Sequence, residues 1–280
     1  PLFNRRRLHS LPGAPPAWPT EMTESRIIWI ASYPKSGNTW VRFLLANMLF
    51  GHVKTSADIE AMVPDVHRAD EIKAQYHVGG TVFLKTHWAL QDKMPQREKT
   101  AAAIHIVRHP LDVLRSHIDY MGLAEDDAKR GLFIDAFVAS GGAPAWQKRG
   151  YGSWISNLHS WYGARQSFPM LNMKYEDVKA DPAAAVQRIA TFFQLEPDAS
   201  EVMRIVDASS FERMRELEVA EIQSGAEGFF QTERGHSNDP NFRFMRAGSI
   251  GGYRDFMSGP QLAAAKDRFG EIAEQLGYEL

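Results

Sequence analysis

Hydrophobic and polar positions divide the chain into two alternating kinds of segment. Short, largely apolar runs occupy 26–32, 81–84, 103–107 and 170–175, and the first of them is rich in β-branched residues. Polar residues follow each run, and apolar positions then recur at the spacing of an amphipathic helix, for example at 183–194. Continuous apolar runs of this length are typical of parallel strands, whose sheet is covered on both faces. The pattern predicts an α/β fold, a three-layer parallel sheet flanked by helices.

Residues 1–25 differ in composition from the rest of the chain. They contain three consecutive arginines followed by several prolines, and they lack the apolar core of a signal peptide. Pro-rich composition of this kind is typical of disorder, so we interpret 1–25 as a disordered leader or an artificial extension. Residues 26–280 contain no linker-like stretch. We therefore expect one domain over 26–280.

Charge and composition exclude several classes of function. The 280 residues carry a formal net charge of −2, which gives no support for a nucleic-acid or anionic membrane surface. The chain has no cysteine, which excludes disulfides, cysteine-ligated zinc and a thiol nucleophile. No apolar run approaches the roughly 20 residues that cross a bilayer. We expect a cytoplasmic protein that binds neither nucleic acid nor membrane, and its oligomeric state stays open.

The residues after the first apolar run suit an anion. Lys35, Ser36, Gly37, Asn38 and Thr39 lie between a predicted strand and a predicted helix, where unpaired N–H groups carry the positive end of the helix dipole. The glycine lets the backbone approach a ligand, the polar side chains can donate hydrogen bonds, and the lysine adds a charge. This combination suits phosphate or sulfate, although a solvated turn has similar composition. Because the lysine precedes the glycine, the order differs from a Walker A loop.

Residues Tyr33 to Trp40 resemble the 5′-phosphosulfate loop of the sulfotransferase family, Tyr-Pro-Lys-Ser-Gly-Thr-Thr-Trp, and differ from it at Asn38. Further blocks resemble that family in the same order along residues 26–258. These blocks are Lys85-Thr86-His87, the run from Arg108 to Ser116, Tyr175-Glu176-Asp177, Ser209-Ser210-Phe211 and Arg246-Ala247-Gly248. The resemblance implies a P-loop-like sulfotransferase fold within the predicted α/β class.

The resemblance also implies an activity. A member of this family transfers a sulfuryl group from 3′-phosphoadenosine 5′-phosphosulfate (PAPS) to a hydroxyl or amine of a small-molecule acceptor, leaves 3′-phosphoadenosine 5′-phosphate (PAP), and needs no metal. Two other functions are compatible with the strand–helix pattern. A P-loop nucleotide or small-molecule kinase would need a Walker-type lysine, which the loop lacks. A catalytically silent PAP-binding module would be expected to lose the loop lysine or the base, and the chain retains Lys35 and His87.

Three catalytic roles follow from the resemblance. Lys35 would stabilise the bridging oxygen as the S–O bond breaks, and Lys85 would be a second cation at the sulfuryl group. His87 would be the general base, because an imidazole with a pKa of about 6.5 exchanges protons near neutral pH. A surface lysine and a structural histidine are the alternatives.

The remaining blocks would bind the nucleotide. Pro110 is well placed at the first position of a helix, so Ser116 would lie about two turns along it and reach the same 3′-phosphate as Arg108. An Arg108–Asp112 ion pair is the alternative. Trp40 and Tyr175 would sandwich the adenine. The other expected contacts are Phe211 at the edge of the pocket, Ser209 at the adenosine, and Arg246 and Gly248 over the 3′-phosphate. Ala247 replaces a family lysine, which would remove one phosphate contact.

Acceptor specificity is expected outside these blocks. The candidate segments are 51–80, 120–150 and 215–245, which are loop-rich with scattered aromatic residues. Residues 225–234 could form a mobile lid whose Phe229 and Phe230 line a pocket, with an exposed loop as the alternative.

Overall fold

The computed structural model describes residues 26–51, 53–68, 80–94, 96–235, 242–245 and 248–280. The leader expected at 1–25 lies outside these residues, as do Arg246 and Ala247.

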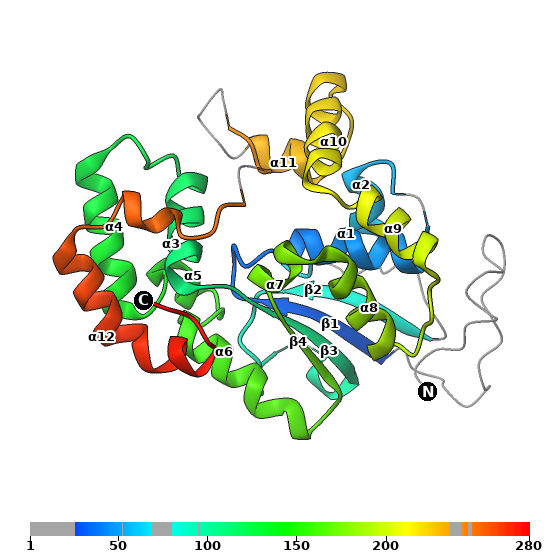
Figure 1. The fold of residues 1–280 in the computed structure, drawn as a ribbon, viewed down its shortest axis with the longest axis horizontal. Helices are drawn as coiled ribbons and strands as arrows, with labels where there is room; N and C mark the ends of the chain where they lie inside the picture. The colour runs from blue at the N-terminus through cyan, green and yellow to red at the C-terminus, as the bar shows by residue number, and fades with distance from the viewer. Residues whose placement is uncertain (1–25, 52, 69–79, 95, 236–241, 246–247) are drawn as a thin grey trace.

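A four-stranded parallel sheet forms the middle layer (Figure 1). Its strands are β1 (Arg26–Ser32), β2 (Thr81–Thr86), β3 (Thr100–Val107) and β4 (Met170–Lys174), in the spatial order β2-β1-β3-β4. All three neighbouring pairs are parallel. The predicted α/β class and all four predicted strands are confirmed. β2 and β3 extend beyond the predicted ranges, because their ends include polar residues that pair with β1.

Both faces of the sheet are buried, which explains why β1 is apolar without alternation. Ile28 and Ile30 belong to one core cluster, which also contains side chains from α1, α8 and α9. Trp29 and Ala31 belong to a second cluster on the other face, together with Trp161 of α6. Each fully buried side chain of this size contributes about 1.5–3 kcal/mol. Burial on both faces therefore stabilises the three-layer arrangement.

Helices surround the sheet (Figure 1). The longer helices are α1 (Asn38–Leu49), α3 (Pro110–Tyr120), α4 (Asp127–Ser140), α6 (Trp154–Gly163), α8 (Pro182–Phe192), α9 (Ala199–Ala208), α10 (Phe211–Ser224) and α12 (Gly259–Gln275). The shorter ones are α2 (Ser56–Met62), α5 (Pro144–Lys148), α7 (Tyr175–Ala180) and α11 (Phe229–Gly235), with 3₁₀ turns η2 (Arg97–Lys99), η3 (Ala164–Gln166) and η4 (Gly252–Asp255). Among the described residues, no helix is long and apolar enough to cross a membrane.

Helix starts place polar residues at the carboxyl edge of the sheet. α1 begins directly after the loop that follows β1, and α3 begins at Pro110 after β3. Proline is favourable at this first position because its missing N–H would have no helical partner there. α7 begins directly after β4. Because the strands are parallel, these connections converge at one edge, where α/β proteins bind ligands.

Candidate active site

A cleft of about 390 Å³ lies at this edge and brings most of the predicted site residues together. Of the predicted residues, the cleft is lined by Lys35, Gly37, Asn38, Thr39, Trp40, Lys85, His87, Arg108, Ser116, Tyr175, Phe211 and Gly248. Ser36 and Ser209 do not line it. Arg246 cannot be assigned to it, since it lies outside the described residues.

The loop after β1 is tightly wound around the start of α1. Gly37 is the N-cap residue of α1, with φ of 93°, and Lys35 also has a positive φ, of 67°. Positive φ is uncommon for a residue with a side chain and indicates a constrained turn. The turn is held from outside by Arg108, whose Nη1 donates to the carbonyl of Lys35 at 3.0 Å. The N–H groups at the start of α1 thus face the cleft beside two cationic side chains.

Two side chains of this loop bind the protein rather than the cleft. The Nδ2 of Asn38 donates to the carbonyl of Ile30 at 2.9 Å and to the hydroxyl of Ser32 at 3.2 Å. In this structure the two hydrogens of this amide tie the loop to β1 rather than point to an anion, and its donation to an oxyanion stays a prediction. Ser36 is also buried, and it lines a small cavity together with His105 rather than the cleft. Its role as an anion donor stays a prediction.

Lys35 reaches the part of the cleft that contains Tyr120 and Phe244, named the acceptor side here because these residues belong to the segments expected to bind the acceptor. Its Nζ lies 4.2 Å from the ring centroid of Tyr120 and 5.1 Å from that of Phe244. Aromatic faces attract cations, and this attraction strengthens when water is excluded. The ammonium is thus held over two rings at the boundary between the anion loop and the rest of the cleft.

Lys85 is an ion-paired cation at the wall of the cleft. Its Nζ lies 2.6 Å from Oδ2 of Asp65, and both side chains are buried. Burial lowers the pKa of Lys85, whereas Asp65 acts in the opposite direction and favours the charged form. Burial also raises the pKa of Asp65, but the charges of Lys85 and Arg42 outweigh it and hold that pKa well below its usual range.

His87 is oriented by the end of β1. Its Nδ1 lies 2.8 Å from the main-chain carbonyl of Ser32. Because a carbonyl only accepts, Nδ1 carries the proton, and the neutral ring leaves a lone pair on Nε2. Burial, then the charge of Lys85, lower the pKa of His87 well below its ordinary value. The imidazole is therefore neutral at neutral pH, which is the state that a general base requires.

Arg108 joins three parts of the site. Besides its bond to the Lys35 carbonyl, its Nη2 donates to the carbonyl of Ser249 at 2.7 Å, and its guanidinium lies 4.3 Å from the ring centroid of Tyr175. The alternative partner Asp112 instead accepts from the N–H of Gly251, at 2.9 and 3.0 Å. The buried Nε of Arg108 has no hydrogen-bond partner among the residues that the structure describes. Arg108 and Ser116 line the same cleft, as predicted.

The aromatic residues differ from the predicted arrangement. Trp40 and Tyr175 meet edge to face, with ring centroids 6.0 Å apart and planes at 68°. In this structure the two rings are not parallel, so they do not form the facing pair that a sandwiched base requires. The hydroxyl of Tyr175 donates to the carbonyl of Gly248 at 3.0 Å. Tyr175 therefore supports the 248–251 segment, and Phe211 lines the cleft nearby.

Ser209 has a structural contact instead of the expected adenosine contact. It is fully buried, and its hydroxyl accepts from Nδ2 of Asn47 in α1 at 3.1 Å. The contact joins the end of α9 to α1. The sequence block was located correctly, but this side chain points into the protein because α1 and α9 pack together.

The acceptor side contains residues that the sequence analysis did not single out. They include Asp65, His67, Arg68, Tyr120, Arg149, Tyr151 and Glu233. The Nε2 of His67 accepts from the main-chain N–H of His87 at 2.8 Å, and the two imidazoles stack with centroids 5.7 Å apart. No local pattern marks these residues. Apart from Tyr151, which lies just beyond 120–150, they belong to the segments 51–80, 120–150 and 215–245 that were expected to bind the acceptor.

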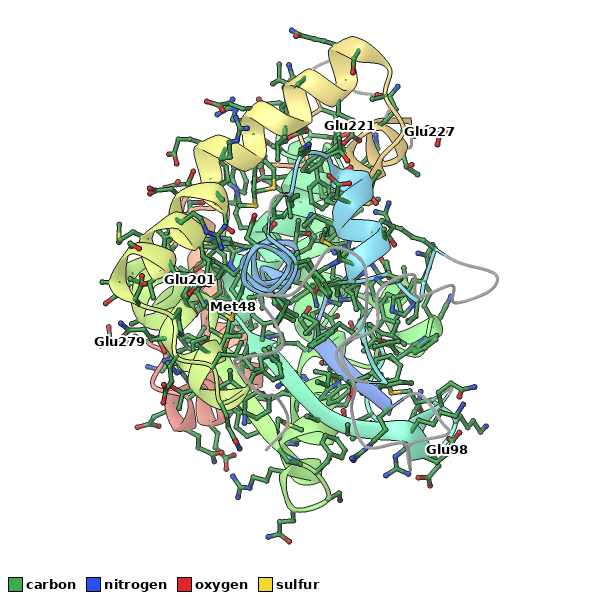
Figure 2. The ribbon with its side chains drawn as sticks, turned by 90° about the vertical axis from the view of Figure 1, so that its right-hand side faces the viewer. Met48, Glu98, Glu201, Glu221, Glu227 and Glu279 are labelled. Atoms are coloured by element: carbon green, nitrogen blue, oxygen red, sulfur yellow. The ribbon has the colours of Figure 1, made fainter. Side chains whose placement is uncertain are left out.

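The expected lid forms a helix that side-chain contacts hold at both ends, rather than an exposed loop. Phe229 lines the cleft as predicted, whereas Phe230 is fully buried in the core. Figure 2 shows Glu221 where α10, α2 and α11 meet, and its carboxylate accepts from Ser56 at 2.5 Å and from the N–H of Gln231 at 2.9 Å. At the other end of α11, Glu233 accepts from Tyr120 at 2.6 Å and also pairs with Arg68.

Among the described residues, no group of three or more His, Asp or Glu side chains is arranged to hold a metal ion.

Known proteins resemble this chain along most of its length. The sulfotransferase domain family matches residues 25–277. Mouse sulfotransferase 1B1 is 27% identical over 246 residues, covering 82% of this chain and 77% of the relative. Rabbit amine sulfotransferase is 24% identical and covers 89% of this chain and 79% of its own.

Solved structures share the fold. A retinol dehydratase in complex with retinol and PAP superposes with a TM-score of 0.65 at 18% identity, covering 92% of this chain and 83% of that one. Mouse sulfotransferase SULT7A1 complexed with PAP superposes with a TM-score of 0.60 at 20% identity, covering 89% and 84%. The predicted P-loop-like sulfotransferase fold is confirmed. Since the family match spans nearly the whole chain, the protein belongs to the sulfotransferase domain family and is a PAPS-dependent sulfotransferase.

Proposed function

We propose that the protein transfers the sulfuryl group of PAPS to a hydroxyl or amine of a small-molecule acceptor, with His87 as the general base. The observation that carries this proposal is that Lys35, His87 and Arg108, which come from three different strand ends, line one cleft. An ammonium, a neutral imidazole and a guanidinium at one sheet edge suit a nucleotide with anionic groups at both ends of its ribose.

The residues of the cleft fit such a nucleotide. The N–H groups at the start of α1, together with Lys35, would hold the 5′-phosphosulfate. Arg108 and Ser116 would hold the 3′-phosphate, and the buried Nε of Arg108 is a donor that still needs an acceptor. A side chain at position 37 would collide with Tyr175, so the close packing of this loop on Tyr175 requires glycine.

The chain supplies positioning, charge and proton transfer. When bound, PAPS supplies the sulfuryl group and its leaving group. His87 would accept the proton of the acceptor hydroxyl or amine at Nε2, since Nδ1–H is bonded to Ser32. Lys35 would oppose the negative charge that develops at the 5′ end. A donor aimed at developing charge in this way typically contributes about 3–4 kcal/mol.

The acceptor class follows from the wall opposite the anion loop. Aromatic rings of Tyr120, Tyr151, Phe229 and Phe244 line this part of the cleft. Flat apolar faces with a few polar groups are typical of small-molecule sites. An acceptor that presents one nucleophilic oxygen or nitrogen to His87 fits this wall.

Binding and turnover measurements test the proposal. In calorimetry with PAP, ADP and ATP, we expect tight binding only of the 3′-phosphorylated nucleotide, and activity that survives EDTA. Equal or stronger ATP binding would overturn the assignment in favour of a kinase. A screen of phenols, alcohols and amines with radiolabelled PAPS identifies the acceptor, and a protein that binds PAP but sulfates none of them would be a silent binding module.

A substitution separates catalysis from binding. His87→Ala should abolish turnover and leave the PAP dissociation constant within about threefold, because the proposed role of the side chain is to take a proton from the acceptor and not to bind an anionic group of the nucleotide. His159→Ala is a suitable control, since His159 belongs to α6 and does not line the cleft. Turnover retained by His87→Ala would refute the general-base role.

A further inference from the structure

A short segment after α2 runs beside the carboxyl end of β2. The N–H of Lys85 donates to the carbonyl of Pro64 at 2.8 Å, and the N–H of Val66 donates to the carbonyl of Lys85 at 3.1 Å. These two bonds form an isolated parallel bridge in which Asp65 is paired with Lys85. Residues paired in register project to the same face of a sheet, so the carboxylate and the ammonium are brought together by the backbone.

The Asp65 carboxylate is fully engaged. Oδ2 lies 2.6 Å from Nζ of Lys85 and 3.3 Å from Nε of Arg68, and Oδ1 accepts from the N–H of His67 at 3.0 Å. Its own N–H donates to Glu60 at 2.7 Å. Asp65 is 4% exposed, and the three contacts to its carboxylate, with the bond from its N–H, hold it and the ammonium that it binds in one geometry.

The same segment reaches the proposed base. His67 lies two residues beyond Asp65, and its Nε2 accepts from the main-chain N–H of His87. The His67 ring stacks on His87 with the two planes at 8°. One stretch of four residues, 64–67, therefore contacts both Lys85 and His87 at the wall of the cleft.

We propose that Asp65 is a positioning residue of the sulfotransferase site, holding Lys85 as an oriented cation beside the reacting groups and, through His67, fixing the main chain of His87. This inference rests on the proposed function, because it assigns the purpose of the two residues in sulfuryl transfer. The family resemblance covered Lys85-Thr86-His87 and did not extend to Asp65 or His67.

The surrounding charges explain why Lys85 needs this partner. Burial disfavours the ammonium, and Arg42 from α1 and Arg68 from the 64–68 segment add positive charge beside it. The other ionisable groups of this corner are His67, His87, Glu60, Arg149 and Tyr151. Asp65 is the group that favours the charged form of Lys85. Removing its charge should therefore lower the pKa of Lys85 further.

A measurement on the protein without nucleotide tests the pairing. In protein labelled with ¹⁵N-lysine, a buried, ion-paired ammonium exchanges its protons slowly, and its Nζ signal can be assigned by its loss in Lys85→Arg. We expect this signal in the wild type and its disappearance in Asp65→Asn at the same pH. Asp65→Glu should retain it. Glu60→Gln is the matched control, because it removes the neighbouring carboxylate and leaves the Asp65–Lys85 contact in place.

Kinetics test the consequence for sulfuryl transfer. Asp65→Asn should lower kcat roughly 100-fold, the usual effect of removing one charge-stabilising group, with the acceptor KM changed much less. The alkaline limb of its pH profile should move to lower pH, since Lys85 loses its proton earlier. If the role of Asp65 were purely structural, Asp65→Asn would lower the free energy of unfolding without moving the pH profile of kcat. If Asp65→Asn fails to fold, Asp65→Ser retains an acceptor for the His67 N–H and removes the same charge.

The outcomes separate this inference from the proposed function. Wild-type kcat, pH profile and Nζ signal in Asp65→Asn would overturn the inference and leave the sulfotransferase assignment standing. A wild-type protein that binds ATP as tightly as PAP and transfers no sulfuryl group would contradict the proposed function and the inference with it.

Discussion

The ring of Tyr175 lies directly against the backbone of Gly37. A Cβ atom at position 37 would come 2.4 Å from Cδ2 of Tyr175 and 3.0 Å from Cε2. The ring cannot retreat easily, because its hydroxyl is bonded to Gly248 and Arg108 covers its face. The anion loop and the first turn after β4 are therefore fitted together at a position that only glycine can occupy.

Gly37→Ala should weaken PAP binding and destabilise the fold. The substitution adds a collision to the strain of φ 93°, together costing about 1–3 kcal/mol. Calorimetry with PAP and urea denaturation measure the two effects. Gly51→Ala is the matched control, because Gly51 has φ of 88° but no atom within 4 Å of a Cβ. Equal losses of stability and unchanged PAP affinity in both variants would show that the contact with Tyr175 is unimportant.

Arg108→Gln should reduce the preference for PAP over ADP. Removing a buried cation that pairs with a phosphate typically weakens binding by about 2–5 kcal/mol. The affinity for PAP should therefore fall by at least roughly 30-fold. ADP, which lacks the 3′-phosphate, should lose much less. Arg204→Gln is a comparable control, since Arg204 also donates to a main-chain carbonyl, that of Asn47, but does not line the cleft. A parallel loss of PAP and ADP binding would place the Arg108 charge elsewhere on the nucleotide.

Glu233→Gln should loosen the acceptor side of the cleft. Glu233 fastens α11 to Tyr120 and Arg68, and the loss of a partly buried ion pair costs about 1 kcal/mol, or roughly fivefold in the acceptor KM. The PAP dissociation constant should be unchanged. Hydrogen exchange of 229–235 measures the loosening directly, and we expect faster exchange there than in the wild type.

The control for this prediction is Glu227→Gln in the connection between α10 and α11, where the side chain is exposed (Figure 2). Faster exchange in Glu227→Gln as well, or an altered PAP affinity in Glu233→Gln, would contradict the role of Glu233 as the fastening residue.

Buried neutral histidines should make the fold sensitive to mild acid. Burial lowers the pKa of His105 to about 4, and burial and the charge of Lys35 lower that of His117 to about 3. The unfolded chain binds protons at these residues below about pH 6.5, whereas the native protein does not. Stability should thus be constant above about pH 7 and fall toward pH 4, by up to about 1.4 kcal/mol per pH unit for each histidine.

Urea denaturation at pH 7, 6 and 5 measures this slope. His105→Gln should reduce it by the share of one histidine, because glutamine does not titrate. A free energy of unfolding that is the same at pH 7 and pH 5 would rule out neutral burial of these imidazoles.

The sequence alone determined the strands and the kind of site. Apolar runs that are buried on both faces can be recognised locally, because each residue in them must be hydrophobic whatever packs against it. The position of Lys35, His87 and Arg108 at one edge also followed from the sequence, since parallel strands bring their carboxyl ends together. The family blocks could also be located from the sequence, because each is a contiguous stretch of residues and the blocks occur in the family's order along the chain.

Only the tertiary structure decided which way individual side chains point. Asn38 faces β1 and Ser209 faces α1, because their hydrogen-bond partners belong to other segments. Asp65 lies beside Lys85 because the chain after α2 returns to the edge of β2, and no short pattern records that return. Contacts between distant segments depend on how complete helices pack, so they become visible only when the whole chain is folded.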